Sequence, residues 1–136
     1  MKKIIVKCTI QQPIQRVWKL WTTPEHIMNW NHANAEWHTP RASNDLKTGG
    51  AFVYHMAAKD GSMAFDFGGT YTKVVTCDLI AYQLADGREV MVSFRSVDDS
   101  TEVIETFDPD DNPIDMQQQG WQAILNNFKA YAERVS

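Results

Sequence analysis

The chain has 136 residues, of which 43% are hydrophobic and 22% are charged, and its formal net charge is −4. These values are typical of a globular domain, and we predict a single domain over residues 1–136. The acidic balance, without any basic run, argues against nucleic acid as a partner, because phosphate binding depends on clustered cations. No apolar run approaches the about 20 residues of a membrane-spanning helix, so no span is predicted.

The start of the chain and its cysteines indicate a cytoplasmic protein. Lys7 interrupts the apolar residues near the N-terminus, so we predict no signal peptide. Cys8 and Cys77 each lie in a segment with a strand-like pattern, and neither has a C-x-x-C partner. We therefore expect two buried, reduced thiols rather than a disulfide.

The first quarter of the chain predicts one strand and two short helices. Residues 3–11 contain β-branched side chains in rough alternation, as in a strand. Pro13 suits the first turn of a helix. Apolar residues then recur at helical spacing, at Ile14, Val17, Trp18 and Trp21. A second helix is predicted to begin with Thr23 as its cap and Pro24 in its first turn, and to end near Trp30.

Residues 35–107 change to short segments of alternating apolar side chains. Turns between these segments are predicted at residues 60–61, 86–87 and 98–100, where Asp, Gly and Ser gather. Strands joined by such short turns favour an antiparallel meander.

The longest helix is predicted at the end of the chain. Asn112 is expected to cap it, with Pro113 at the first helical position and Asp115 in the first turn. One apolar stripe follows, formed by Trp121, Ile124, Leu125, Phe128, Tyr131, Ala132 and Val135. Polar residues are expected mostly on the other side, at Gln117, Gln118, Gln119, Asn126, Asn127, Lys129 and Glu133.

The predicted fold is therefore of the α+β class. A curved antiparallel sheet of about six to seven strands must bury one face, and the long amphipathic helix can cover that face. If the sheet curls around the helix, a space lined by large aromatic side chains opens between them. Concave apolar sites of this kind bind small molecules.

Short residue strings along the whole chain carry a resemblance to a known family. They include Thr22-Thr23-Pro24, Trp30-Asn31, Asp45-Leu46, Gly49-Gly50, Lys59-Asp60-Gly61-Ser62, Asp86-Gly87-Arg88 and Gln119-Gly120-Trp121. In this order and spacing they resemble the START-like (SRPBCC) superfamily, in the branch named for the activator of heat-shock protein 90 ATPase and also described as polyketide cyclase-like. The resemblance implies the helix-grip fold and a pocket, while ligands and activities vary between members.

The sharpest candidate for chemistry is Glu105. It shares strand parity with Val103 and Phe107, which indicates an inward face, and burial there would raise its pKa. Such a carboxyl could anchor a polar ligand or act as an acid or base. The alternative is a carboxylate bonded to Arg95, Arg88 or a tyrosine hydroxyl, with no chemistry.

The residues that we expect to contact a ligand combine inward parity on the sheet with the stripe of the last helix. They are Trp30, Phe52, Tyr54, Phe65, Phe67, Tyr71, Phe94, Trp121, Leu125 and Phe128, with Glu105 and His38 as polar contacts. Glu105 is the weak candidate for a catalytic residue.

Several kinds of site lack support in the sequence. The histidines, His26, His32, His38 and His55, show no zinc spacing, and we predict neither a metal nor a cofactor. His55 alternates with Tyr54 and should face solvent, whereas His38 could reach the pocket. No G-x-S-x-G string or local Ser–His pair indicates a nucleophile. The glycine pairs at 49–50 and 68–69 suit turns and bends of the sheet rather than phosphate loops.

Three functions follow from this pattern. The first is the binding of a hydrophobic or amphipathic small molecule, lipid-like or polyketide-like, between sheet and helix, without catalysis. The second is a cyclase or hydratase that uses the same cavity, with Glu105 as acid or base. The third is a co-chaperone or other protein-interaction module of the type implied by the resemblance.

Overall fold

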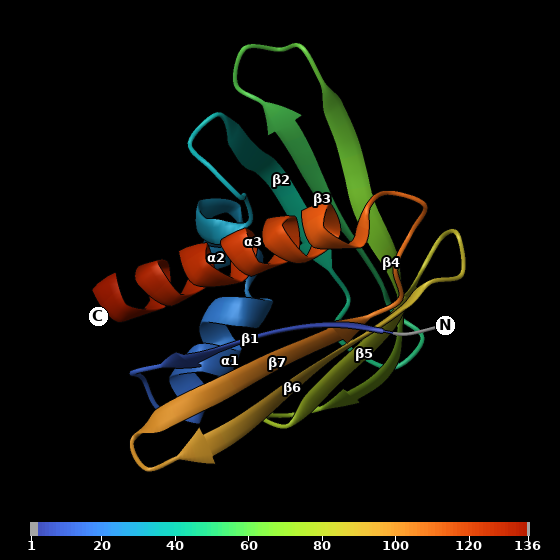
Figure 1. Ribbon diagram of the computed structural model, residues 1–136. Coiled ribbons are helices and arrows are strands. Elements are labelled where there is room, and N and C mark those ends of the chain that lie inside the picture. The colour runs from blue at the N-terminus through green and yellow to red at the C-terminus, as the bar shows by residue number, and fades with distance from the viewer. Residues whose placement is uncertain (1–2, 136) are drawn as a thin grey trace.

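Seven strands form one antiparallel sheet that curls around the last helix in the computed structural model, which describes residues 3–135 (Figure 1). The strand order is β1-β7-β6-β5-β4-β3-β2. The elements follow the chain as β1 Ile4–Ile10, α1 Ile14–Thr22, α2 Pro24–Trp30, β2 Trp37–Asn44, β3 Ala51–Ala58, β4 Ala64–Val75, β5 Leu79–Leu84, β6 Glu89–Val97, β7 Ser100–Phe107 and α3 Ile114–Arg134. The helix-grip fold predicted from the sequence is confirmed.

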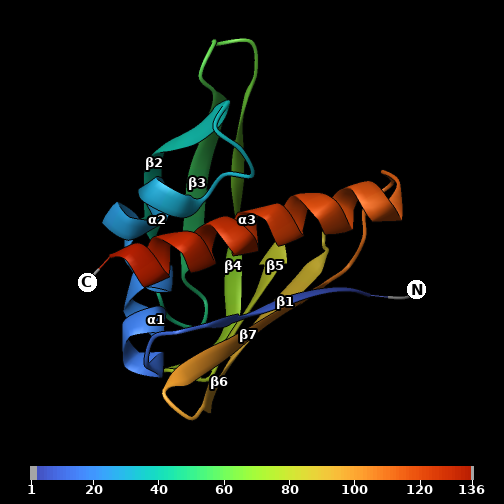
Figure 2. The same cartoon turned by 60° about the vertical axis from the view of Figure 1, so that its left-hand side comes forward.

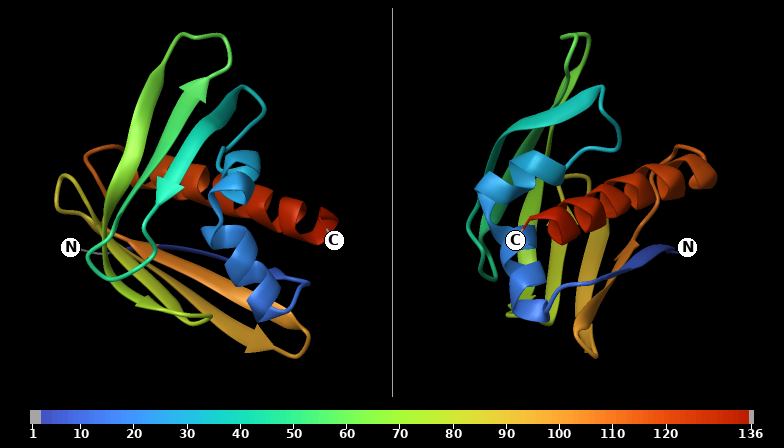
Figure 3. Two further views of the ribbon diagram at one scale, coloured as in Figure 1. Left: turned by 180° about the vertical axis from the view of Figure 1, so that it is seen from behind. Right: turned by 90° about the vertical axis from the view of Figure 1, so that its left-hand side faces the viewer.

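The helices all lie on the concave side of the sheet. Helix α3 crosses this side, and α1 and α2 lie beside its C-terminal end (Figures 1 and 2). Seen from behind, the β2–β3–β4 part of the sheet is strongly rotated against the β6–β7–β1 part (Figure 3). None of the helices in residues 3–135 is long and apolar enough to cross a membrane.

The sheet bends along β4, where two glycines let neighbouring strands approach closely. A side-chain carbon added at Gly69 would overlap the backbone oxygen of Gln83, and one added at Gly68 would come within 2.6 Å of the Phe52 oxygen. A bulge follows between Tyr71 and Lys73. Glycines and bulges increase local twist, so these features explain the curl that the sequence pattern only suggested.

Several predicted element ends are wrong by a residue or more. Pro13 occupies the cap position of α1 rather than its first turn. Thr23 occupies the cap position of α2 and Pro24 its first turn, as predicted, but the Thr23 hydroxyl donates to the Lys19 carbonyl oxygen at 2.7 Å and makes no capping hydrogen bond. Helix α3 begins at Ile114 with Pro113 in the cap position, so Asn112 is not its cap. The position at which each helix begins depends on the path of the backbone between elements, and residue type alone does not determine that path.

The cysteines differ from the prediction in burial and in one position. Both thiols are free. Cys8 lies in β1 and is partly buried. Cys77 lies outside the strands, in the turn between β4 and β5, where its φ of 60° places it in the left-handed region. It is also only partly buried. The prediction of two buried thiols within strands is therefore wrong in burial for both cysteines and wrong in position for Cys77.

Polar residues of α3 cover the free edge of β1, which pairs only with β7. Gln118 donates to the Ile5 oxygen at 3.3 Å, and Lys129 donates to the Thr9 oxygen at 2.6 Å. Between them, Gln122 donates to the backbone of Lys7. An uncovered strand edge invites pairing with another chain, and these side chains occupy it. Part of the polar side predicted for this helix, including Gln118 and Lys129, therefore contacts the edge of the sheet.

An aromatic cluster fills the space between α1, α2 and the C-terminal half of α3. The Phe128 ring lies 4.8 Å from the rings of both Trp21 and Trp30, which lie 4.7 Å from each other. Leu125 and Ala132 are fully buried beside it. This half of the molecule is therefore a solid core.

Candidate functional site

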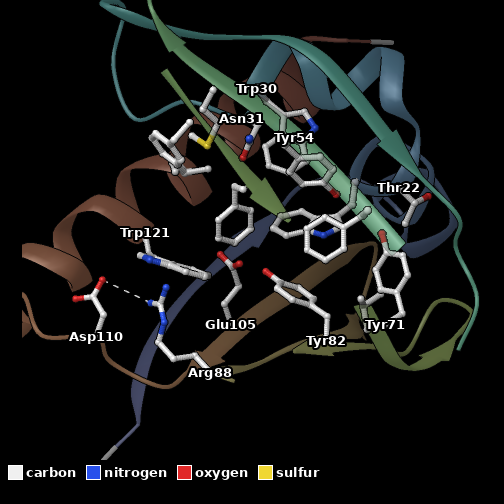
Figure 4. Close-up of a pocket in the computed structure, with 17 residues that line it drawn as sticks. Thr22, Trp30, Asn31, Tyr54, Tyr71, Tyr82, Arg88, Glu105, Asp110 and Trp121 are labelled. Carbon is white, nitrogen blue, oxygen red and sulfur yellow. Dashed lines mark ion pairs between the residues drawn. The ribbon is translucent and has the colours of Figure 1, made fainter. Parts of the chain in front are cut away.

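A cavity of about 290 Å³ lies between the N-terminal half of α3, the C-terminal ends of α1 and α2, and strands β3, β4, β5 and β7 (Figure 4). Its volume is about that of the smaller ligand pockets in proteins. Its wall consists of Trp21, Thr22, Trp30, Asn31, Phe52, Tyr54, Met56, Phe65, Phe67, Tyr71, Ile80, Tyr82, Arg88, Glu105, Asp110, Trp121 and Ile124.

The Glu105 carboxyl points into this cavity from the middle of β7. Its neighbours across the strands are Val6 on β1 and Val92 on β6, and both are buried. Glu105 is 6% exposed, and burial raises the pKa of its carboxyl from 4.5 to about 8. An inward strand position among apolar neighbours thus holds a carboxylic acid that is mostly protonated at neutral pH.

Glu105 has no protein partner in the part of the chain that the structure describes. Burial is the only cause of its raised pKa, since no cation and no hydrogen bond contributes. Arg95 instead pairs with Glu102 on the outer face, at 2.9 Å. Arg88 pairs with Asp86 and Asp110. The alternative predicted from the sequence, a carboxylate bonded to one of these arginines, is therefore wrong.

Three tyrosines bring hydroxyl groups to the same cavity. Tyr54, Tyr71 and Tyr82 come from β3, β4 and β5 and are drawn together with Glu105 in Figure 4. Burial raises the pKa of Tyr54 and of Tyr82 well above 10, and the Glu105 carboxyl adds to both shifts. Burial also raises the pKa of Tyr71. All three are therefore neutral hydroxyls at physiological pH.

An ion pair lies at one end of the cavity. The Arg88 guanidinium, from the turn between β5 and β6, lies 3.6 Å from the Asp110 carboxylate, from the loop before α3 (Figure 4). Arg88 also donates to Asp86 at 2.8 Å. This pair joins two loops across the sheet and places the strong charges of the wall at its rim, away from the Tyr71 end.

Most of the residues predicted to contact a ligand lie in the cavity wall. These are Trp30, Phe52, Tyr54, Phe65, Phe67, Tyr71, Glu105 and Trp121. They share inward parity on β3, β4 and β7 or a position where α2 and α3 face the sheet. Contact with a ligand stays a prediction for each of them.

Four residues of that predicted set lie outside the wall. Phe94 faces inward but packs edge-on against Trp18 under α1, with ring centres 5.2 Å apart. Leu125 and Phe128 are fully buried in the solid core. His38 lies on β2 opposite Ala57 and does not reach the cavity. Parity places a side chain on a face of the sheet, but it does not say how far along the helix the cavity extends.

The wall also contains residues that sequence reasoning missed. Tyr82 alternates with Ile80 and Leu84, yet Leu79 and Ala81 are apolar too, so the pattern assigned no inward face to β5. Arg88 and Asp110 reach the cavity from loops, where periodicity gives no signal. The one signal available was the position of Tyr82 relative to the turn at residues 86–87, which could have indicated which face of the strand its side chain lies on.

The histidines lie away from the cavity. His55 is on the outer face of the sheet, as its alternation with Tyr54 predicts, and its Nδ1 lies 2.7 Å from the Asp66 carboxylate. His26 Nδ1 lies 2.6 Å from the Tyr131 hydroxyl between α2 and α3. In residues 3–135, no group of three or more His, Cys, Asp or Glu side chains is arranged to hold a metal ion.

Comparisons with known proteins agree with the fold. The family described as Activator of Hsp90 ATPase homolog 1-like protein matches residues 11–133. A solution structure from Cytophaga hutchinsonii is 55% identical, with a TM-score of 0.85 over 96% of this chain and 92% of that chain. The AHSA1-like protein from Aeromonas hydrophila is 47% identical, with a TM-score of 0.91 over the same shares.

A more distant structure shares the fold alone. The Aha1 dimer from Colwellia psychrerythraea is 17% identical, with a TM-score of 0.79 over 98% of each chain. No curated protein matches the chain.

Proposed function

The chain belongs to the family of Activator of Hsp90 ATPase homolog 1-like proteins, and we propose that it binds a small amphipathic molecule in the cavity beneath α3. The observation that carries this proposal is a cavity of about 290 Å³, walled mainly by aromatic rings, with one unpartnered carboxyl inside. A cavity of about 150 Å³ is enough for a single benzene ring. The cavity therefore has the size for a body of one or two rings.

The chemistry of the wall supports an amphipathic ligand rather than a purely apolar one. Buried polar groups without partners are costly, and a bound molecule with its own polar group would satisfy them. Glu105 provides a carboxyl of this kind inside an otherwise aromatic space, whereas the Tyr54 hydroxyl is hydrogen-bonded to Tyr71. Ligand pockets commonly combine an apolar lining with a few convergent polar groups of this kind.

Filling the cavity from its roof tests this proposal. Ile124 lies in the wall and is only partly buried, so Ile124→Trp should fold while occupying the space. The matched control is Ala130→Trp, at an exposed position of the same helix. Thermal unfolding with a panel of one- and two-ring compounds should show ligand-dependent stabilisation of the wild type and of the control, but not of Ile124→Trp. Equal stabilisation of all three proteins would place the binding elsewhere.

A second candidate function is acid catalysis of the cyclase or hydratase kind. The buried Glu105 favours it, since a pKa of about 8 keeps a proton available for transfer at neutral pH. The distinguishing measurement is proton exchange next to the carbonyl of a cyclic ketone, followed by NMR in deuterated water. Exchange that depends on the protein and is lost in Glu105→Gln would favour an enzyme over a binding protein.

The family description also suggests an interaction with a chaperone ATPase. This third hypothesis rests on family membership alone. It predicts that the purified chain changes the ATPase rate of an Hsp90 protein.

A further inference from the structure

Glu105 differs from the other carboxyls near the cavity because it has no positive partner. Asp110 has Arg88, and Glu102 has Arg95. Within residues 3–135, by contrast, only burial shifts the pKa of Glu105, and no cation or hydrogen bond contributes. Arg88 and Arg95 are therefore already paired, and a positive partner for the ionised form of Glu105 would come from a bound molecule.

Aromatic rings surround the place that such a charge would occupy. The Phe67 ring lies 5.9 Å from that of Trp121 at an interplanar angle of 77°, and 6.3 Å from that of Tyr82 at 87°. Trp121 and Tyr82 are drawn on either side of the Glu105 carboxyl in Figure 4. Rings set nearly perpendicular to each other present both faces and edges to one space. Ring faces attract cations, most strongly where water is excluded.

From this juxtaposition of a lone buried carboxyl and three aromatic rings, we infer that the cavity binds an organic cation. The ligand class is an ammonium group carried on an apolar body of one or two rings. The ammonium lies against Glu105, and the body fills the aromatic part of the cavity. This inference rests on the proposed binding function and adds the charge of the ligand. A cation would interact with both the carboxyl and the faces of the aromatic rings, whereas a neutral alcohol would only form a hydrogen bond with the carboxyl.

Binding of a cation has a defined proton balance. The pKa of about 8 means that Glu105 is mostly a neutral acid at pH 7. When the ammonium ion enters, the carboxyl loses its proton to the solvent, and an ammonium–carboxylate pair forms. Below about pH 8, the apparent affinity for the cation therefore rises about tenfold for each pH unit. A neutral ligand that accepts a hydrogen bond from the acid would bind equally well at all pH values below about 8 and would lose affinity only above that pH.

The other titratable groups that face Glu105 do not change charge in this range. Burial raises the pKa of Tyr82 and Tyr54 well above 10, and it raises the pKa of Cys8 on β1 to about 12. The Arg88 guanidinium is paired with Asp110. The parts of β4 and α3 at this end of the cavity contribute Phe67, Trp121 and Ile124, which do not titrate. A pH dependence of binding here therefore reports on Glu105.

The test compares two compounds of the same shape, 2-aminoindane and 2-indanol, by calorimetry at about pH 6, 7 and 8. Measurement in two buffers with different ionisation enthalpies gives the number of protons released. For 2-aminoindane we expect an affinity that rises about tenfold between pH 6 and 7, with release of close to one proton. For 2-indanol we expect weaker binding without proton release.

Two variants assign the effect to one carboxyl. In Glu105→Gln, the preference for the amine and its pH dependence should both disappear. The control Glu102→Gln removes the outward carboxyl three residues earlier on the same strand, and it should keep both. If 2-indanol binds as tightly as the amine, or if the affinity of the amine falls as pH rises, the inference of a cationic ligand is wrong. The proposal that the cavity binds a small molecule would still stand. If neither compound binds the wild type, the binding function is wrong as well.

Discussion

The two halves of α3 face the same sheet with the same apolar stripe, yet one half packs solidly and the other roofs a cavity. Leu125 and Phe128 are fully buried, and the rings of Trp21 and Trp30 fill the space around Phe128. Four residues before Leu125, Trp121 stacks on Phe107 at 3.8 Å and borders the cavity. The difference comes from α1 and α2, which lie beside only the C-terminal end of α3.

The cavity therefore exists because the space between α3 and the sheet is not filled at this end, and not because its wall has an unusual composition. Beneath the N-terminal half of α3, the sheet bends along β4, where Gly68 and Gly69 let the backbones of β3 and β5 approach closely. Large rings from β3 and β5 then line the cavity without closing it. An apolar stripe determines which side of a helix is buried, but the elements opposite determine whether the buried side is filled.

Truncation of the solid half should have the largest effect on stability. Phe128→Ala leaves an unfilled space beside the two rings of Trp21 and Trp30, and we expect a loss of about 3–5 kcal/mol in the free energy of unfolding. Ile124→Ala only enlarges an existing cavity at a partly exposed position, so its loss should stay near 1 kcal/mol. Urea unfolding at one pH compares the two variants. Equal losses would mean that the roof is as tightly packed as the core.

The second largest effect should be a pH dependence of stability that arises from Glu105, at the cavity beneath the N-terminal half of α3. In the unfolded chain, Glu105 ionises near pH 4.5, whereas in the folded chain it keeps its proton up to about pH 8. The folded state therefore binds more protons between these values, and wild-type stability falls as pH rises through them. Glu105→Gln cannot ionise, so its stability relative to the wild type should grow by about 3 kcal/mol from pH 5 to pH 8.

Urea unfolding of both proteins across that pH range gives this difference directly. Glu102→Gln is the control, because that carboxyl faces outward and pairs with Arg95. A gap between wild type and Glu105→Gln that stays constant with pH would show that the Glu105 carboxyl is ionised in the folded protein.

The smallest effect concerns the polar face that both halves of α3 share. Gln122 exchanges two hydrogen bonds with the backbone of Lys7, at 3.1 and 3.4 Å. Gln122→Ala should cost about 1 kcal/mol and speed hydrogen exchange at the Lys7 amide. Gln119→Ala, at an exposed position on the same helix, is the control and should change neither. Unchanged exchange at Lys7 would mean that α3 does not protect this edge.

Much of the site was predictable because strand parity and helix spacing report directly on which face is buried. Glu105 was found because Val103 and Phe107 flank it two residues away on either side. Phe94 has the same parity as Val90 and Val92 but lies where α1 fills the space. Alternation therefore identified the inward side chains without separating those at the cavity from those in the core.

The residues that were missed depend on the turns and on the bend of the sheet. Arg88 and Asp110 meet only because the turn after β5 and the loop after β7 lie at the same end of the sheet. Cys77 lies outside its predicted strand because it forms part of the turn between β4 and β5, where its φ is 60°. Contacts between residues distant in the chain have no local signature, since each depends on the register of the strands between them.

The sequence by itself determined the order of the elements and the inward direction of Glu105, because periodicity and turn chemistry act over a few neighbouring residues, and the resemblance of its residue strings to a family added the helix-grip fold. Only the tertiary structure decided that Glu105 has no partner and that the space beside it stays open. Both depend on where α1, α2 and the bend in β4 place atoms from distant parts of the chain, and packing in three dimensions alone fixes that placement.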